Sequence, residues 1–358
     1  MLPILLIYNA VMLLADWRAL RFVRARPGFV ACTQAFIGGG LVAFMLALLL
    51  GGGGFFSVRL LSWGIFLHGA IGLAGCVVVL RGKPGLRALA LVLLLALEAI
   101  CAWAFLIEPF RLEVNHHVVE STRVDAPLRI AVLADIQTDD VGEHERRALT
   151  EAMAAEPDLI LLPGDYIHTP DRKLRDEQRA ALRELMAEVG LDAPLGVFAT
   201  RGNCEPAQSG WEEIFAGLPI TVASDTQRYE LDDAPITITA LGLMDSFRPG
   251  IRVELPAREG DLHIVVGHGP DFARGQVFAD LLIAGHTHGG QVRIPGFGPP
   301  LTLSTVPRDW AAGRTELERG STLIVSRGVG MERNEAPRLR FLCPPEVVIV
   351  DVVPVAQP

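Results

Sequence analysis

Apolar residues are concentrated in the first third of this chain of 358 residues. Three apolar runs, 29–50, 60–80 and 88–107, contain no Lys or Arg and reach the length of about 20 residues that a helix needs to cross a bilayer core. A fourth run, 2–15, is apolar but short, and we expect Asp16 to end it. The pattern predicts four membrane spans within residues 1–107, with three as the alternative.

Basic residues around these runs predict how the spans are oriented. Arg residues cluster between the first two spans at 18–26, and Arg and Lys cluster between the last two at 81–87. Basic loops stay in the cytoplasm, so we expect a multi-pass protein of the cell (inner) membrane whose remaining residues lie on the extracytoplasmic, periplasmic side. His68 and Glu98 lie in the middle of spans and are expected to make polar contacts inside the bundle. Because no paired intramembrane charges or broken helices are evident, a transporter is disfavoured.

After residue 107 the pattern changes to short apolar strands that alternate with amphipathic helices. We expect a connector at 108–127 and one domain at 128–358. The predicted helices are 144–155, 173–189 and 210–216, and the predicted strands are 129–133, 159–162, 196–199, 236–241, 263–266, 281–284, 322–325 and 347–352. Early strand–helix alternation followed mostly by strands predicts an α/β sandwich.

Charge separates the two parts. Residues 1–107 carry a net charge of +6, and the remaining residues carry −15. Nucleic-acid binding depends on neutralising phosphates with Lys and Arg, so this acidic domain is not expected to bind nucleic acid. The five cysteines have no spacing typical of a disulfide framework or a zinc site.

Polar residues follow five of the predicted strands at the point where each strand ends. They are Asp135, Asp165, Asn203, His268 and the pair His286 and His288, mostly beside a glycine. In open α/β sheets, sites form outside the carboxyl ends of the strands, so these side chains are expected to converge. Oxygen and nitrogen donors of this kind suit Mn, Fe or Zn.

The order of these motifs, D-I-Q, G-D, G-N-C-E, G-H and G-H-T-H, resembles the calcineurin-like metallophosphoesterase superfamily. The stretch G-H-T-H-G-G-Q-V-R-I-P and the closing S-R-G-V-G and R-F-L-C-P-P-E-V are similar to its membrane-linked bacterial branch. The resemblance covers the whole soluble domain. It implies a four-layer α/β/β/α sandwich that hydrolyses phosphoesters with two divalent metal ions.

The resemblance also implies the roles of individual residues. One metal would be held by Asp135, Gln137, Asp165 and His288, and the second by Asp165, Asn203, His268 and His286, with Asp165 as the bridge. Asn203, Cys204 and His268 would be the catalytic residues.

Two positions depart from the family pattern. Gln137 replaces a histidine ligand, and because an amide oxygen is a harder donor than imidazole, the change favours Mn, with Fe or Zn as alternatives. Cys204 replaces the histidine that is taken to assist the leaving group, and a thiol with a pKa of ~8.5 is a poor acid near neutral pH. Arg201 and His168 are further candidates for binding the substrate.

The leading hypothesis is therefore a membrane-anchored, dinuclear metal-dependent phosphohydrolase that cleaves a phosphoester or phosphoanhydride bond of a phosphorylated small molecule or lipid, with a lipid-linked or a nucleotide diphosphate as the candidate substrates. The alternative is a catalytically weakened sensor that keeps the fold and a metal. The sequence leaves the substrate and the oligomeric state open.

Overall fold

The computed structural model describes residues 2–205, 210–252 and 256–355. Contacts divide the chain into two units, one comprising residues 1–107 with 334–338 and the other comprising residues 108–333 with 339–358.

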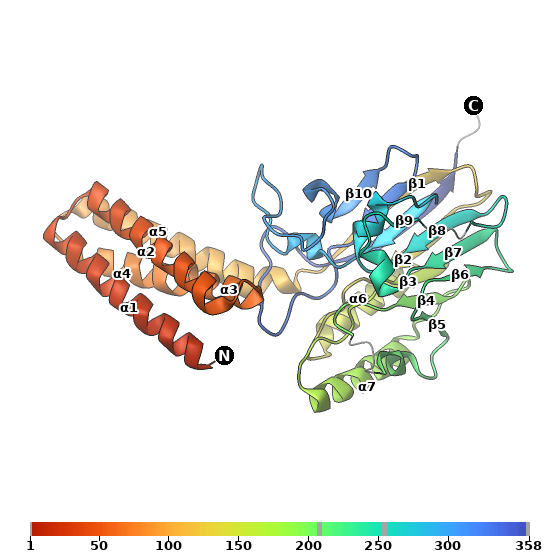
Figure 1. Cartoon of the computed structure of the whole chain (residues 1–358), viewed down its shortest axis with the longest axis horizontal. Coiled ribbons are helices and arrows are strands. Elements are labelled where there is room, and N and C mark those ends of the chain that lie inside the picture. The colour runs from red at the N-terminus through yellow and green to blue at the C-terminus, as the bar shows by residue number, and fades with distance from the viewer. Residues whose placement is uncertain (1, 206–209, 253–255, 356–358) are drawn as a thin grey trace. The chain divides into compact units, whose positions relative to one another are not determined.

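The first unit consists of apolar helices (Figure 1). Among the described residues, four helices are long and apolar enough to cross a membrane: Leu2–Ala25, Phe29–Gly51, Phe55–Val79 and Pro84–Phe110. They comprise α1 (Leu2–Ala25), α2 (Phe29–Gly51), α3 (Phe55–Trp63), a π-helical turn η1 (Gly64–His68), α4 (Gly69–Val79), α5 (Pro84–Ala102), η2 (Trp103–Ile107) and η3 (Glu108–Phe110). The apolar runs predicted from the sequence leave residues 51–59 as the loop between the second and third spans. In the structure α3 begins at Phe55 and includes Arg59, so this loop is shorter than predicted.

The expectation that Asp16 ends the first helix is wrong, because the helix continues to Ala25. The Asp16 carboxylate is buried beside His68, with Oδ2 at 2.7 Å from His68 Nδ1, and His68 Nε2 lies 3.0 Å from Asn9 Oδ1. A buried carboxylate is tolerated when it is paired. The helices therefore do contain a paired acidic and basic side chain, which the sequence did not reveal. Glu98, by contrast, is exposed on α5 and not turned into the bundle.

The second unit is a sandwich of two six-stranded sheets. The first sheet has the order β1-β12-β2-β3-β4-β5, and the second has the order β10-β11-β9-β8-β7-β6. The strands are β1 (Glu113–Ser121), β2 (Leu128–Val132), β3 (Leu159–Leu162), β4 (Val197–Thr200), β5 (Ile220–Ala223), β6 (Gln227–Glu230), β7 (Ile236–Ala240), β8 (Leu262–Val266), β9 (Leu281–Ala284), β10 (Gly313–Glu316), β11 (Thr322–Val325) and β12 (Glu346–Pro354).

Most neighbouring strands are parallel and consist mainly of buried apolar residues, whereas β12 runs antiparallel to β2. Strands β2 to β5 are parallel neighbours, as are β7, β8, β9 and β11. Side chains from both sheets, such as Ile130, Leu161, Ile238 and Ile283, pack together between them. Strands buried on both faces need apolar residues at every position, which is why these segments were recognisable from the sequence.

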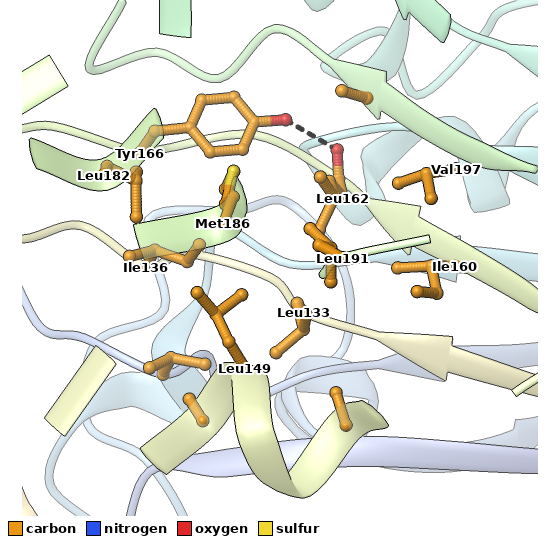
Figure 2. Close-up of a cluster of buried hydrophobic side chains, with 14 of the residues drawn as sticks. Leu133, Ile136, Leu149, Ile160, Leu162, Tyr166, Leu182, Met186, Leu191 and Val197 are labelled. Atoms are coloured by element: carbon orange, nitrogen blue, oxygen red, sulfur yellow. Dashed lines mark hydrogen bonds between the residues drawn. The ribbon is translucent and has the colours of Figure 1, made fainter. Parts of the chain in front are cut away.

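The outer face of the first sheet is covered by α6 (Glu143–Ala154) and α7 (Arg172–Val189), with the short η4 (Trp211–Phe215). Figure 2 shows this core, in which Leu149 from α6 and Leu182 and Met186 from α7 pack onto strand residues such as Ile160. The other outer layer is built from short helices, α8 (Leu243–Ser246), η5 (Pro270–Arg274) and η7 (Arg308–Ala311). The predicted four-layer architecture is confirmed.

Two predicted boundaries need correction. The segment 108–127, expected to be a connector, contains β1, an edge strand that pairs in parallel with β12 from Glu113↔Glu346 to Ser121↔Pro354. The predicted helix at 210–216 is a single 3₁₀ segment, Trp211–Phe215.

Candidate metal centre

The carboxyl ends of five inner strands bring the predicted ligands to one edge of the sandwich. Asp135 follows β2, Asp165 follows β3, Asn203 follows β4, His268 follows β8, and the G-H-T-H segment follows β9. The side chains of Asp135 and Asp165 and of all three histidines are buried. Parallel neighbours end at the same side of a sheet, so five loops far apart in the chain meet here.

Two groups of side chains in this cluster have the geometry to hold a metal ion. Asp165, His268 and His286 form one group, and Asp135, Asp165 and His288 form the other, with the ligand atoms of each group within 4.8 Å of one another. Asp165 belongs to both. Buried carboxylate and imidazole donors that share one carboxylate fit a pair of divalent cations.

The two predicted amide ligands lie against the same groups. Asn203 Oδ1 is 2.8 Å from His268 Nε2, and Gln137 Oε1 contacts His288 Nε2. The structure thus brings all seven predicted metal ligands together.

The amide of Gln137 is oriented by its nitrogen. Gln137 Nε2 lies 2.9 Å from His168 Nδ1, 3.1 Å from Cys204 Sγ and 3.2 Å from Glu332 Oε2. Three acceptors around the NH₂ group leave the oxygen as the atom that faces His288 and the metal group.

The backbone is unusual where the ligands lie. Five predicted ligands have positive φ angles: Asp135 (48°), Gln137 (33°), Asp165 (57°), His286 (68°) and His288 (48°). Left-handed backbone is costly for residues other than glycine, on the order of 1–3 kcal/mol each, and persists where the surrounding fold imposes it. A Cβ on Gly202 would lie only 2.1 Å from Asp165 N, so this approach of the β3 and β4 loops requires glycine.

Backbone carbonyls fix the rings of two histidines. His268 Nδ1 donates to Pro163 O at 2.9 Å, and His286 Nε2 donates to Leu303 O at 3.2 Å. In each ring this leaves the other nitrogen as the one that would bind a metal, as is usual for histidine ligands. His268 Nε2, which faces Asn203 Oδ1 at 2.8 Å, would have to lose its proton first.

Burial and the charges of neighbouring groups shift the pKa values of the carboxylates and histidines in this cluster strongly. Burial raises the pKa of Asp135 to about 7. Burial would lower the pKa of His268, but the Asp165 and Asp135 carboxylates outweigh it and raise this pKa to about 9. Burial lowers the pKa of His286 to about 4. Burial also opposes ionisation of Asp165, yet the positive charge of His268 keeps the pKa of this carboxyl below its usual range.

These pKa shifts predict that metal binding depends on pH. Without metal, Asp135 with a pKa of about 7 and His268 with a pKa of about 9 both carry protons at pH 6. Metal ligands must be deprotonated, so we expect Mn²⁺ affinity to rise between about pH 6 and 9 and protons to be released on binding. Calorimetric titration in buffers of different ionisation enthalpy measures both quantities. An affinity that stays constant over this pH range would contradict the prediction.

Two buried acidic residues at the site were not predicted. The Glu205 carboxylate accepts hydrogen bonds from the backbone N–H groups of Asp165 (3.1 Å), Tyr166 (2.7 Å) and Gly202 (3.0 Å), which holds the β3 and β4 loops together. The sequence signal that could have identified Glu205 is its position as the last residue of the G-N-C-E motif. Glu332 lies on a loop far along the chain from Gln137, and no sequence pattern marks it. Burial and the charges of Asp165 and Asp135 raise the pKa of Glu332 to about 8.

The remaining predicted residues are also at or beside the site. The Cys204 N–H donates to Asp165 Oδ1 at 2.8 Å, and burial raises the pKa of its thiol well above the usual value, so the thiol stays neutral. His168 lies next to Gln137 and Glu332. Arg201 Nε donates to Glu205 O at 2.9 Å, so part of this guanidinium is bound to the loop itself. The roles of Arg201 and His168 in binding a substrate stay predictions.

Known proteins are similar to the part of the chain that contains this cluster. The family model described as calcineurin-like phosphoesterase matches residues 128–290. A metallophosphoesterase of Bacillus subtilis, YkuE, is 28% identical over 69% of this chain and 87% of its own length. A metallophosphoesterase of Aquifex aeolicus is 26% identical over 69% of this chain and 94% of its own. The Escherichia coli phosphodiesterase YaeI is 28% identical over 64% of this chain and 83% of its own.

One solved structure is also similar. A dimetal phosphatase from Danio rerio matches 60% of this chain and 91% of its own, with 15% identity and a TM-score of 0.34.

Proposed function

Residues 128–290 form a domain of the calcineurin-like phosphoesterase family, and on that premise we propose that the protein is a membrane-anchored phosphohydrolase with two divalent metal ions. Its reaction is the cleavage of a phosphoester or phosphoanhydride bond. The observation that carries the proposal is the position of Asp165, whose buried carboxylate belongs to both groups of potential metal ligands.

The chain's own residues hold and orient this centre. When bound, two divalent cations supply charge that stabilises the attacking and leaving oxygens of a phosphoryl group. Glu205 fixes the loop that carries Asp165, and the group of His168, Cys204 and Glu332 fixes the amide of Gln137.

Manganese is the metal we propose. Asp135, Asp165, Gln137 and Asn203 offer four residues with oxygen donors against three histidines, and oxygen donors favour Mn²⁺ over softer ions. Iron and zinc are the alternatives that a metal analysis would distinguish.

The proposed location is the cell membrane, with the phosphoesterase domain on the extracytoplasmic side. This is supported by four helices of sufficient length and by the basic residues at 18–26 and 81–87. A substrate at this location is a lipid-linked phosphate or diphosphate, or a nucleotide diphosphate.

Reporter fusions test the orientation. An alkaline phosphatase fused after Pro358 should be active, because that enzyme folds only outside the cytoplasm, and a fluorescent protein that folds only in the cytoplasm should stay dark. The opposite pair of results would reverse the proposed orientation.

The proposed activity is tested by metal analysis together with turnover of the purified full chain. We expect two Mn²⁺ per chain and hydrolysis of an aryl phosphodiester, with activity lost on chelation and restored by Mn²⁺. One metal per chain without turnover of monoesters, diesters or diphosphates would instead support the metal-binding sensor, which Gln137 and Cys204 suggest because both depart from the family pattern.

A further inference from the structure

An exposed apolar hairpin lies beside the metal centre. We use the name apolar hairpin for residues 291–304, in which four large side chains are about half exposed: Ile294 (47%), Phe297 (52%), Leu301 (46%) and Leu303 (49%). Leu342, 48% exposed, adjoins Phe341, which pairs with Val292 at the base of the hairpin. Apolar side chains gathered in this way on a surface indicate a binding face.

The hairpin is held in a fixed shape. Phe297 N donates to Ile294 O at 3.0 Å across Pro295 and Gly296, and Gly296 has a φ of 76°, which is the geometry of a type II turn. Ile294 and Gly298 exchange two further backbone hydrogen bonds of 3.0 and 2.9 Å. The apolar side chains are therefore presented outward by the backbone.

The end of the hairpin is anchored as well. The Asp271 carboxylate accepts hydrogen bonds from Ser304 Oγ (2.8 Å) and from the backbone N–H of Thr305 (2.8 Å). The apolar surface thus has a defined position relative to the strands of the second sheet.

The hairpin contacts the metal centre directly. It begins three residues after His288, and its Leu303 carbonyl accepts the hydrogen bond of 3.2 Å from His286 Nε2. Gln291 Oε1 accepts from the backbone N–H of Glu332 at 2.7 Å. A molecule whose phosphate lies at Asp165 would therefore extend past these apolar side chains.

The charge of this segment differs from that of the rest of the domain. Residues 289–308 contain two Arg and no acidic residue, although the part of the chain after residue 107 carries a net charge of −15. The Arg308 guanidinium lies 4.3 Å from the centre of the Phe297 ring. Exposed apolar and aromatic side chains flanked by Arg suit a hydrocarbon chain that bears an anionic head group. A nucleoside would instead require hydrogen-bonding groups for its base.

The connection between the last apolar helix and the domain is short enough to keep the domain close to membrane lipids. Only Arg111 and Leu112 separate the last helix that could span a membrane, ending at Phe110, from β1, which begins at Glu113. A connection of two residues keeps the domain at the membrane surface when that helix is inserted.

We propose that the apolar hairpin binds the hydrocarbon chain of a lipid phosphate or lipid diphosphate while its phosphate group lies at the metal centre. The inference rests on the proposed function and selects the lipid over the nucleotide diphosphate as its substrate class.

Two synthetic diesters with the same leaving group test the inference. Hexadecyl p-nitrophenyl phosphate carries a long chain, and methyl p-nitrophenyl phosphate does not. The full chain with Mn²⁺ in amphipol should have a higher kcat/KM for the hexadecyl ester. In the triple variant Ile294→Ser, Phe297→Ser, Leu301→Ser, the ratio of the two kcat/KM values should fall at least about tenfold, because three apolar contacts with the chain are lost. Binding of hexadecylphosphonate should weaken similarly.

Phe278→Ser is the matched control, because Phe278 is 72% exposed but lies outside the hairpin. This variant should keep the wild-type ratio. Unchanged melting temperature and metal content in the triple variant would show that it folds. The inference would be overturned if the triple variant kept the wild-type ratio of the two kcat/KM values. It would also be overturned if light scattering showed that the substitutions convert a dimer into a monomer while this ratio stays the same. Absence of turnover of both esters by the wild type would refute the proposed function itself.

Discussion

Replacing Asp165 with asparagine is expected to reduce kcat/KM for an aryl phosphodiester at least about 100-fold, as loss of a preorganised electrostatic group does. Asp165 belongs to both groups of potential metal ligands, so the substitution removes negative charge shared by two cations and leaves them to repel each other. Asparagine retains an oxygen that can accept the 2.8 Å hydrogen bond from the Cys204 N–H, so the loop should keep its shape. The metal content should fall below two ions per chain.

The control for this variant is Asp233→Asn, which removes an exposed carboxylate on the loop before β7 and should leave turnover and metal content unchanged. His286→Ala provides a second test of the centre, because it removes a ligand of only one group. If Asp165→Asn and His286→Ala both retain near-full turnover, the assigned centre is wrong.

The second large effect concerns the leaving group. Cys204 departs from the family pattern that the motifs resemble, in which a histidine occupies this position, and burial raises the pKa of its thiol well above the usual value. Without an imidazole to donate a proton, cleavage should depend steeply on the basicity of the leaving oxygen. Phosphoanhydrides and aryl esters leave as weakly basic anions, whereas alkyl esters leave as strongly basic alkoxides. Because general acid catalysis contributes roughly 10²–10⁴-fold, the wild-type difference between these substrates should be similarly wide.

Restoring the imidazole should narrow that difference. In Cys204→His, turnover of an alkyl ester should rise more than turnover of an anhydride, measured as kcat/KM for one substrate of each kind. The competing source of the proton is His168, whose Nδ1 accepts from Gln137 Nε2 at 2.9 Å and whose Nε2 then carries the hydrogen. If His168 is the acid, His168→Ala should selectively reduce alkyl-ester turnover, and Cys204→His should change both substrates equally. Equal wild-type rates for an alkyl phosphate and a diphosphate would exclude the account based on Cys204.

The sequence alone was sufficient to locate the inner strands and to predict which polar side chains meet at their ends. Strands such as β3 and β8 are buried on both faces, so a run that is wholly apolar in β3 and interrupted only by His263 in β8 identified them. The polar residues immediately after these runs, including Asp165 and His268, meet because parallel strands end at one edge of the sandwich. A pattern that is local in the sequence, a polar residue after an apolar strand, therefore predicts which side chains lie close together in the fold.

Edge strands were less visible. Strand β1 (Glu113–Ser121) mixes polar and apolar residues without regular alternation and pairs with β12, more than 200 residues later in the chain. Strands β6 and β10 are short, with exposed side chains, and likewise form edges. A strand that depends on a distant partner leaves little periodic signal of its own.

Only the tertiary structure decided how charged residues are accommodated. The carboxylate of Asp16 is compatible with a long first helix because His68, 52 residues away, lies at 2.7 Å from it. Glu332 acquires its place at the site by contacting Gln137 across 195 positions of sequence. The apolar hairpin is exposed because a Pro-Gly turn and the anchor at Asp271 hold it outward. Local patterns specify which segments become strands and which residues follow them, whereas the partner of a buried charge and the exposure of an apolar side chain depend on contacts between segments that are distant in the chain.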